Sequence, residues 1–131
     1  MEQEPVFLTL AETAEIHAYQ IDHFGGSDGM RSQEMLESAI GMPSSTFGGS
    51  YLHPTIPDMA AAYLFHLVEN HPFLDGNKRV GTMSALVFLE LNGYDFDASD
   101  DELTGVVLQV ADGKMAKDVL SAFFRQHSRP R

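Results

Sequence analysis

The stretch from His71 to Arg79, with the sequence HPFLDGNKR, brings several reactive side chains together within nine residues. His71 can accept a proton from a hydroxyl group near neutral pH. Asp75 is a hard carboxylate of the kind that binds Mg²⁺ together with water and phosphate oxygens. Lys78 and Arg79 supply positive charge, and the arginine can bind two phosphate oxygens at once. A base, a metal ligand and neutralising charge are what phosphoryl or nucleotidyl transfer requires.

Two apolar helices should position this stretch. We expect one helix to begin at about Pro57 and to end near His71, and the next to run from about Asn77 to Leu91. The free N–H groups of residues 76 to 79 would then point outward at the start of the second helix, where the helix dipole is positive. Gly76 would let a ligand approach the backbone closely. The sequence therefore predicts an anion site at a helix N-terminus.

The distribution of charge supports a phosphate ligand. The chain has 19 acidic residues against 8 Lys and Arg, which gives a formal charge of −11. Five of the eight cations fall in the last 18 residues, and only Arg31, Lys78 and Arg79 precede them. We therefore expect a small anion pocket on a body that otherwise repels anions. The same charge argues against duplex nucleic acid as a direct partner, because binding its backbone needs a broad cationic surface.

Taken singly, these residues also allow structural roles. A histidine after an apolar helix often caps that helix, and an Asp-Gly pair is an ordinary turn. Asn77 can hold either a phosphate oxygen or the loop itself. Phe73 should anchor the loop in the core. Arg31 follows a glycine-rich turn, where it could pair with a carboxylate or touch a ligand, and we favour the structural role.

The other histidines are not expected to belong to the site. His66 lies five residues before His71, which is not the helical spacing of a zinc pair. Three further histidines are isolated in the sequence and are expected to be surface or packing residues: His17, His23 and His53.

Composition and length narrow the class of protein. We expect residues 1–131 to form a single domain, since the chain is long enough to bury a core. There is no cysteine, which excludes disulfides and thiolate metal sites. The acidic N-terminus does not resemble a signal peptide, and no apolar run reaches the length of a membrane span. The expectation is a cytoplasmic protein.

The whole chain reads as an all-α bundle with one glycine-rich loop. Ser99 with Glu102, like Thr9 with Glu12, matches a capping box at the start of a helix. The expected order is helix 9–24, short helix 32–40, loop or short hairpin 41–57, the two central helices, extended segment 94–98, helix 99–111, helix 115–126 and a loose tail 128–131.

The reactive stretch resembles the signature of the Fic/Doc (Fido) family, His-x-Phe-x-Asp/Glu-Gly/Ala-Asn-Gly/Lys-Arg. Other segments resemble its death-on-curing (Doc) branch, so that the resemblance extends over nearly the whole chain. These segments are residues 24–31 (FGGSDGMR), 46–49 (TFGG) and 89–94 (LELNGY). The resemblance implies a compact Fido-type helical bundle with a short flap or hairpin.

The resemblance also implies roles for individual residues. His71 corresponds to a general base that activates a target hydroxyl, and Asp75 to a Mg²⁺ ligand, with ATP as the nucleotide. The flap, implied to hold an extended target segment by strand pairing, contains Phe47, Gly48 and Gly49. The residues implied to contact the nucleotide phosphates are Gly76, Asn77, Lys78 and Arg79.

Two departures from the AMP-transferring Fic pattern bear on the reaction. Lys78 replaces a glycine that opens the anion hole, and Thr82 replaces a second arginine that clamps the triphosphate. Doc toxins share both departures and act as kinases on a threonine of elongation factor Tu. The family's inhibitory motif, Ser/Thr-x-x-x-Glu-Gly/Asn, is absent. Restraint would then have to come from another chain, such as a Phd-like antitoxin.

Four functions follow from these observations. The first is a toxin kinase that transfers the γ-phosphoryl group of ATP to a protein hydroxyl, and the second is transfer of AMP by the same site. The third is an inactive Fido domain that only binds a partner. The fourth, a divalent-metal hydrolase, is weaker because a second cluster of ligands is missing.

Overall fold

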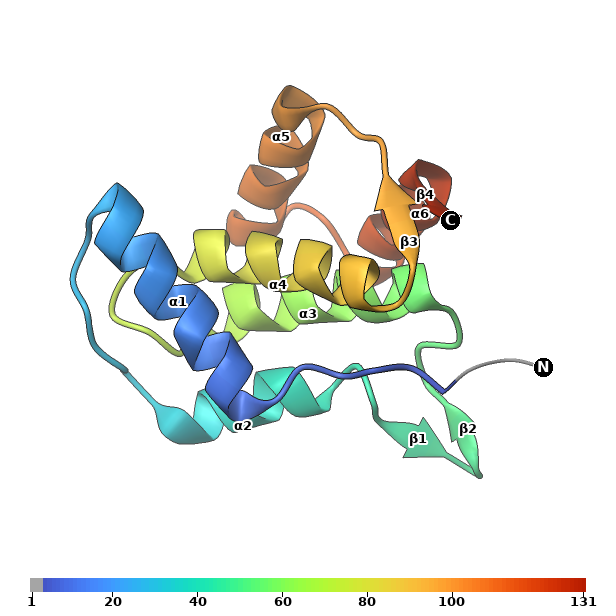
Figure 1. Ribbon diagram of the computed structural model, residues 1–131, viewed down its shortest axis with the longest axis horizontal. Helices are drawn as coiled ribbons and strands as arrows, with labels where there is room; N and C mark the ends of the chain where they lie inside the picture. Colours follow the sequence, from blue (N-terminus) through green and yellow to red (C-terminus); the bar gives the residue numbers. More distant parts are fainter. Residues whose placement is uncertain (1–3) are drawn as a thin grey trace.

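The computed structural model describes residues 4–131 and confirms a mainly α-helical fold (Figure 1). Within these residues no helix is both long and apolar enough to cross a bilayer. The helices are α1 (Leu10–Phe24), α2 (Gln33–Gly41), α3 (Ile56–Asn70), α4 (Asn77–Leu91), α5 (Asp100–Ala111) and α6 (Lys117–His127). The short strands are β1 (Thr46–Phe47), β2 (Ser50–Tyr51), β3 (Tyr94–Phe96) and β4 (Ser128–Pro130).

Side-chain caps start four of these helices. The hydroxyls of Thr9, Ser32, Thr55 and Ser99 accept from backbone N–H groups in the first turn. For α1 and α5 the cap is reciprocal, because the glutamate at the third position also accepts from the N–H of the cap residue. Each such cap stabilises its helix by about 1 kcal/mol. The expected capping boxes are therefore confirmed.

The core is built around α3, which packs against α4 over its length (Figure 1). Ten residues of α3 are buried, including Tyr63, whose hydroxyl accepts from the N–H of Leu8 at 2.9 Å. Gly81 of α4 lies directly against α3, since a Cβ there would stand 3.3 Å from the carbonyl oxygen of Leu64. The two helices run antiparallel, and the loop 71–76 joins them.

The glycine-rich loop contains the expected hairpin. Thr46 pairs with Tyr51 and Phe47 with Ser50, and the turn consists of Gly48 and Gly49. Both glycines have positive φ, 59° and 82°. A two-residue hairpin turn with positive φ at both positions favours glycine, because residues with a side chain rarely adopt this conformation. The paired residues are mostly exposed, and Phe47 is 81% exposed.

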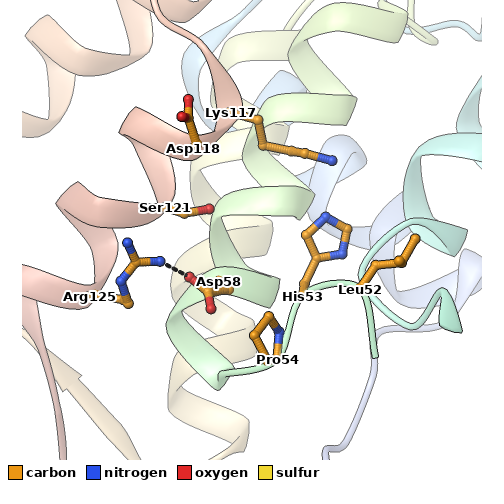
Figure 2. A pocket seen from close by; sticks show the side chains of 8 residues that line it. All are labelled: Leu52, His53, Pro54, Asp58, Lys117, Asp118, Ser121 and Arg125. Carbon is orange, nitrogen blue, oxygen red and sulfur yellow. Dashed lines mark hydrogen bonds and ion pairs between the residues drawn. The ribbon is translucent and has the colours of Figure 1, made fainter. Parts of the chain in front are cut away.

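Polar side chains join helix α6 to α3, and His53, which follows β2, lines the same pocket as Asp58, Lys117 and Arg125 (Figure 2). Arg125 forms an ion pair with Asp58, and the ammonium of Lys117 donates to Nε2 of His66 at 3.1 Å. Burial and the Lys117 charge lower the pKa of His66 to about 4. His53 follows β2 and is buried, as a packing residue should be; burial lowers its pKa as well.

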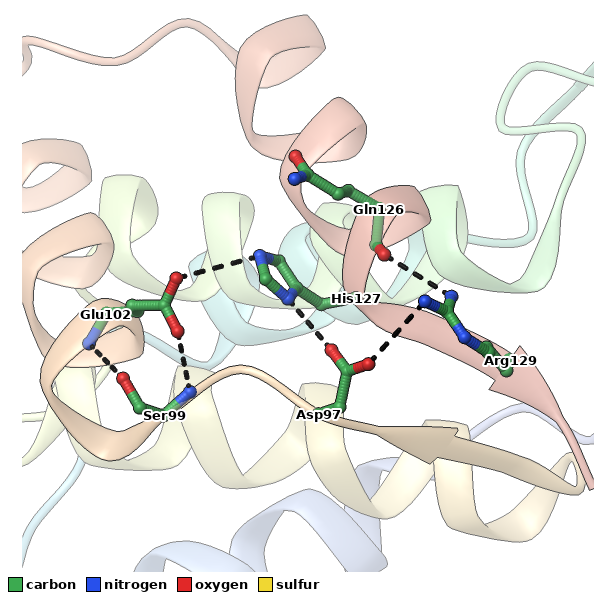
Figure 3. A network of polar contacts seen from close by, with 6 residues as sticks. All are labelled: Asp97, Ser99, Glu102, Gln126, His127 and Arg129. Carbon is green, nitrogen blue, oxygen red and sulfur yellow. Dashed lines mark hydrogen bonds and ion pairs between the residues drawn. The ribbon is translucent and has the colours of Figure 1, made fainter.

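The prediction of a loose C-terminal tail is wrong. Strand β4 pairs antiparallel with β3. The carboxylate of Asp97 lies 2.8 Å from Nδ1 of His127 and 3.7 Å from Nη2 of Arg129 (Figure 3). Arg131 donates to the carboxylates of Glu90 at 3.0 Å and Asp95 at 3.1 Å. A short polar tail carries no apolar signal, and its partners lie more than 30 residues away, so local sequence could not reveal the pairing.

Candidate active site

The loop between α3 and α4 begins and ends on residues in the left-handed conformation. His71 ends α3 with φ 50° and ψ 55°, and Gly76 precedes α4 with φ 81°. Among residues 4–131, His71 is the only non-glycine residue with positive φ. Such a conformation costs about 1 kcal/mol for a residue with a side chain. The imidazole of His71 is exposed, and none of the described residues forms a hydrogen bond with it.

Asn77 holds the loop closed from inside. Its Oδ1 accepts from the N–H of Phe73 at 3.0 Å, and its Nδ2 donates to the carbonyl of Phe73 at 2.9 Å. Asn77 is only 4% exposed, so its amide cannot also face a ligand in solvent. Of the two roles considered for this side chain, the structure shows the structural one. Phe73, at 2% exposure, anchors the loop in the core as expected.

His17 of α1 supports the loop from the other side, a role that the sequence did not suggest. Its ring stacks on Phe73 with centroids 3.7 Å apart, and Nε2–H donates to the carbonyl of Asp75 at 2.8 Å. A signal was nevertheless present. The buried face of α1 consists of Thr13, His17 and Gln20, three polar residues at helical spacing. Polar side chains in such a position need partners, and a loop backbone supplies them.

Asp75 is held in the ionised form. Its two oxygens accept from the N–H groups of Gly76 at 2.9 Å and Ser27 at 3.3 Å. These two bonds, with the nearby Arg79 guanidinium, lower the pKa of Asp75 below its ordinary value. Gly26 allows the close approach, because a Cβ there would lie 2.7 Å from Oδ2 of Asp75. A single exposed carboxylate fits Mg²⁺ that is otherwise bound by water and phosphate oxygens.

The start of α4 offers free backbone donors. Gly76 has no side chain to cap the helix, and the N–H groups of Asn77, Lys78 and Arg79 find no acceptor among residues 4–131. The N–H of Gly76, expected to be free as well, is occupied by Asp75. The carboxylate of the preceding residue accepts from this N–H, so the prediction of a fourth free donor is wrong. Three donors at the positive end of a 15-residue helix remain an anion site.

The two cations of the stretch differ in their surroundings. Arg79 reaches back toward α1, where Nη1 donates to the carbonyl of Gln20 at 3.4 Å. Lys78 is exposed. The hydroxyl of Thr82, one turn further along α4, donates to the carbonyl of Lys78 at 2.7 Å. Thr82 therefore presents no donor to a ligand in this arrangement.

A groove of about 620 Å³ opens beside these residues. Lys78, Arg79 and Thr82 are among the residues that line it. The rest of its wall is mainly apolar and comes from the end of α1, from α4 and from α5. Phe24 and Leu108 are the most exposed of the large apolar side chains in this wall, at 68% and 49%.

Arg31 contacts the motif loop through the backbone. Its Nε donates to the carbonyl of His71 at 2.6 Å, and Nη2 donates to the carbonyl of Asn70 at 2.7 Å. The N–H groups of Arg31 and Ser32 both donate to the carbonyl of Pro72. The expected structural role of Arg31 is confirmed, with carbonyl groups as its partners.

The hairpin and the motif loop lie at opposite ends of α3 (Figure 1). The helix has 15 residues, so that its ends are roughly 20 Å apart. The structure therefore brings His71, Asp75 and the start of α4 together, but not the hairpin residues 47–49. An extended peptide of about six residues would span that separation.

Comparison with known proteins agrees with the motif. The sequence profile of the Fic/DOC family matches residues 7–89. The "Toxin Doc" of Mycolicibacterium smegmatis is 35% identical over 95 residues, which cover 68% of this chain and 73% of that protein. The "Protein kinase doc" of Escherichia phage P1 is 30% identical over 106 residues, covering 80% and 82% respectively. The match includes the loop, the helix start and the α1 residues that support them, and the chain belongs to the Fic/DOC family.

Proposed function

We propose that this protein is a Doc-like toxin that transfers the γ-phosphoryl group of ATP to a Ser or Thr hydroxyl of a translation factor similar to elongation factor Tu. The observation that carries the proposal is the arrangement at the start of α4. An unpartnered imidazole, His71, precedes three free N–H groups and the exposed cation Lys78. The names of the two relatives, a toxin and a protein kinase, support the same activity.

The chemistry follows from the positions of these groups. The hydroxyl oxygen of the target forms a bond to the γ-phosphorus while the bond to the β–γ bridging oxygen breaks, and ADP leaves with that electron pair. A ring nitrogen of His71 takes the hydroxyl proton. The N–H groups of residues 77–79, with Lys78 and Arg79, neutralise charge on the phosphates. Mg²⁺ bound at Asp75 would neutralise further phosphate charge.

Two residues favour phosphoryl over AMP transfer. Lys78 adds a bulky cation at the anion site, where it alters how the phosphates can lie. Thr82 bonds its own helix and offers no clamp for the far end of a triphosphate. AMP transfer by the same site remains the alternative.

Label transfer separates the two reactions. The protein is incubated with a candidate acceptor, elongation factor Tu, and ATP labelled at either the α or the γ phosphate. The proposal expects label on the acceptor only from the γ position. Label from the α position would identify an AMP transferase.

A growth assay tests whether the domain only binds a partner. Expression of the wild-type protein should arrest growth, and His71→Ala should relieve the arrest. Equal arrest by both proteins would indicate an inactive binding domain. The hypothesis of a divalent-metal hydrolase has little support, since no group of three or more metal-ligating side chains occurs in residues 4–131.

We further propose that a Phd-like antitoxin restrains the site in trans. The chain lacks the family's inhibitory motif, and the groove beside Lys78 offers apolar surface next to the anion site. Leu108→Glu, within the groove, should weaken co-purification with the antitoxin. Leu91→Glu is the matched control, because Leu91 is similarly exposed, at 45%, and is not part of the groove wall. Equal complex formation by both variants would exclude the groove.

A further inference from the structure

Arg31 holds the two peptide groups that flank the candidate base. The carbonyl of Asn70 belongs to the peptide plane before the Cα of His71, and the carbonyl of His71 belongs to the plane after it. The guanidinium donates to both, from Nη2 at 2.7 Å and from Nε at 2.6 Å. Because each peptide group is planar, fixing the two carbonyls fixes φ and ψ of His71. The direction of its Cα–Cβ bond is then set as well.

The same segment holds the next residues of the loop. The N–H groups of Arg31 and Ser32 donate to the carbonyl of Pro72 at 2.7 and 3.0 Å. Met30 forms a bridge with Phe73, and the N–H of Leu74 donates to the carbonyl of Gly29 at 3.1 Å. Residues 29–32 therefore run antiparallel beside the loop, and the Arg31 side chain extends their contact to the end of α3.

The Arg31 guanidinium binds backbone carbonyls and forms no ion pair with a carboxylate of the described residues. None of the carboxylates in residues 4–131 lies within 4.0 Å of its guanidinium. It meets instead the last carbonyls of α3, which carry the negative end of that helix dipole. Only a planar fork with donors on separate nitrogens can bind two successive carbonyls in this way. Lysine at this position would reach one carbonyl at a time.

We propose that Arg31 is a positioning residue, which keeps His71 in its left-handed conformation and thereby sets the direction in which its side chain leaves the loop. The proposal rests on the proposed role of His71 as the base. Arg31 lies outside the nine-residue signature and touches no reacting atom; it acts through the backbone of His71. Its loss should therefore lower kcat and leave the affinity for the nucleotide unchanged.

The test uses Arg31→Met, which keeps an unbranched apolar stem and removes all donors. Its control is Lys114→Met, which removes a cation from the turn between α5 and α6. Transfer of γ-label to the acceptor protein is measured at varied ATP. We expect kcat to fall about 10- to 100-fold for Arg31→Met, the range typical of a misplaced catalytic group. The KM for ATP should stay within about 2-fold of wild type, as should both constants for the control.

Arg31→Lys keeps the charge, but its donors share one nitrogen, and it keeps the proposal testable if Arg31→Met does not fold. Its kcat should lie between those of wild type and Arg31→Met. The double variant Arg31→Met with His71→Ala should be no slower than His71→Ala alone, since the two residues act as one unit. A kcat of Arg31→Met equal to that of the control, or a multiplicative loss in the double variant, would overturn the proposal. If His71 is not the base, His71→Ala should retain full activity, which distinguishes this outcome from a failure of the Arg31 proposal.

Discussion

The motif loop and the hairpin both adjoin α3, but they are held very differently. In the loop 71–76, side chains from three other elements bind the backbone: Arg31, Asn77 and His17. The hairpin has two pairs of residues around two glycines, and Phe47 is 81% exposed. A loop that must place a base and an anion site needs this support, because small displacements are costly in catalysis. The hairpin, if it binds an extended target as proposed, can adapt to it.

The largest expected effect concerns the base. His71→Ala should lower the rate of transfer about 10²- to 10⁴-fold, as expected when a general base is lost. The melting temperature should stay near that of wild type, because the imidazole is exposed and has no partner in the described structure. Single-turnover label transfer and thermal unfolding measure the two effects. A large loss of stability would mean that the ring is structural and that the loop contains no free reactive group.

The next effect tests how firmly the loop is held. Asn77→Ala should reduce the free energy of unfolding by about 2–4 kcal/mol, because the buried N–H and carbonyl of Phe73 lose their partners. Asn77→Asp keeps the acceptor but places a buried carboxylate oxygen against the carbonyl of Phe73, so its loss should be at least as large. The hairpin control, Ser50→Ala, should change stability by less than about 0.5 kcal/mol. Urea unfolding measures all three, and equal values would remove the contrast between the two regions.

The hairpin should affect binding of the target and leave stability unchanged. Phe47→Ala removes an exposed aromatic ring and should raise the KM for the acceptor protein about 10-fold, as for an interface anchor. The KM for ATP and the unfolding free energy should not change. Val119→Ala, an exposed apolar residue on α6, serves as the control. An unchanged KM for the acceptor would show that the target binds elsewhere.

Acid should weaken the contact between α3 and α6, where His66 lies, before it affects the motif loop. The pKa of His66 is about 4 in the folded protein against 6.5 ordinarily. Between these values the unfolded chain takes up a proton that the folded protein resists, so stability falls as pH drops from 6.5 toward 4. The low pKa of Asp75 acts in a lower range, since its contribution is lost only as pH falls below 3.8. Urea titrations at pH 7 and pH 5 measure this effect. The free energy of unfolding should fall less between these pH values for His66→Gln than for wild type.

Much of the fold could be predicted because its signals are local. The caps at Thr9, Ser32 and Ser99 act within three residues, and they place helix starts correctly. Gly48-Gly49 likewise marks its own turn. The tail could not be predicted, because Arg131 meets Glu90 and Asp95 only once α4 and β3 are in place.

The same division applies to the candidate site. By itself, the sequence determined which groups are present in residues 71–79 and that they lie at a helix start, since the spacing of apolar residues defines the helices. Only the tertiary structure decided that Asn77 faces inward, that His17 supports Asp75 and that Arg31 binds the backbone of His71. These contacts join residues up to 58 positions apart. Periodicity records which face of a helix is buried, whereas the partner on that face depends on how separate helices pack.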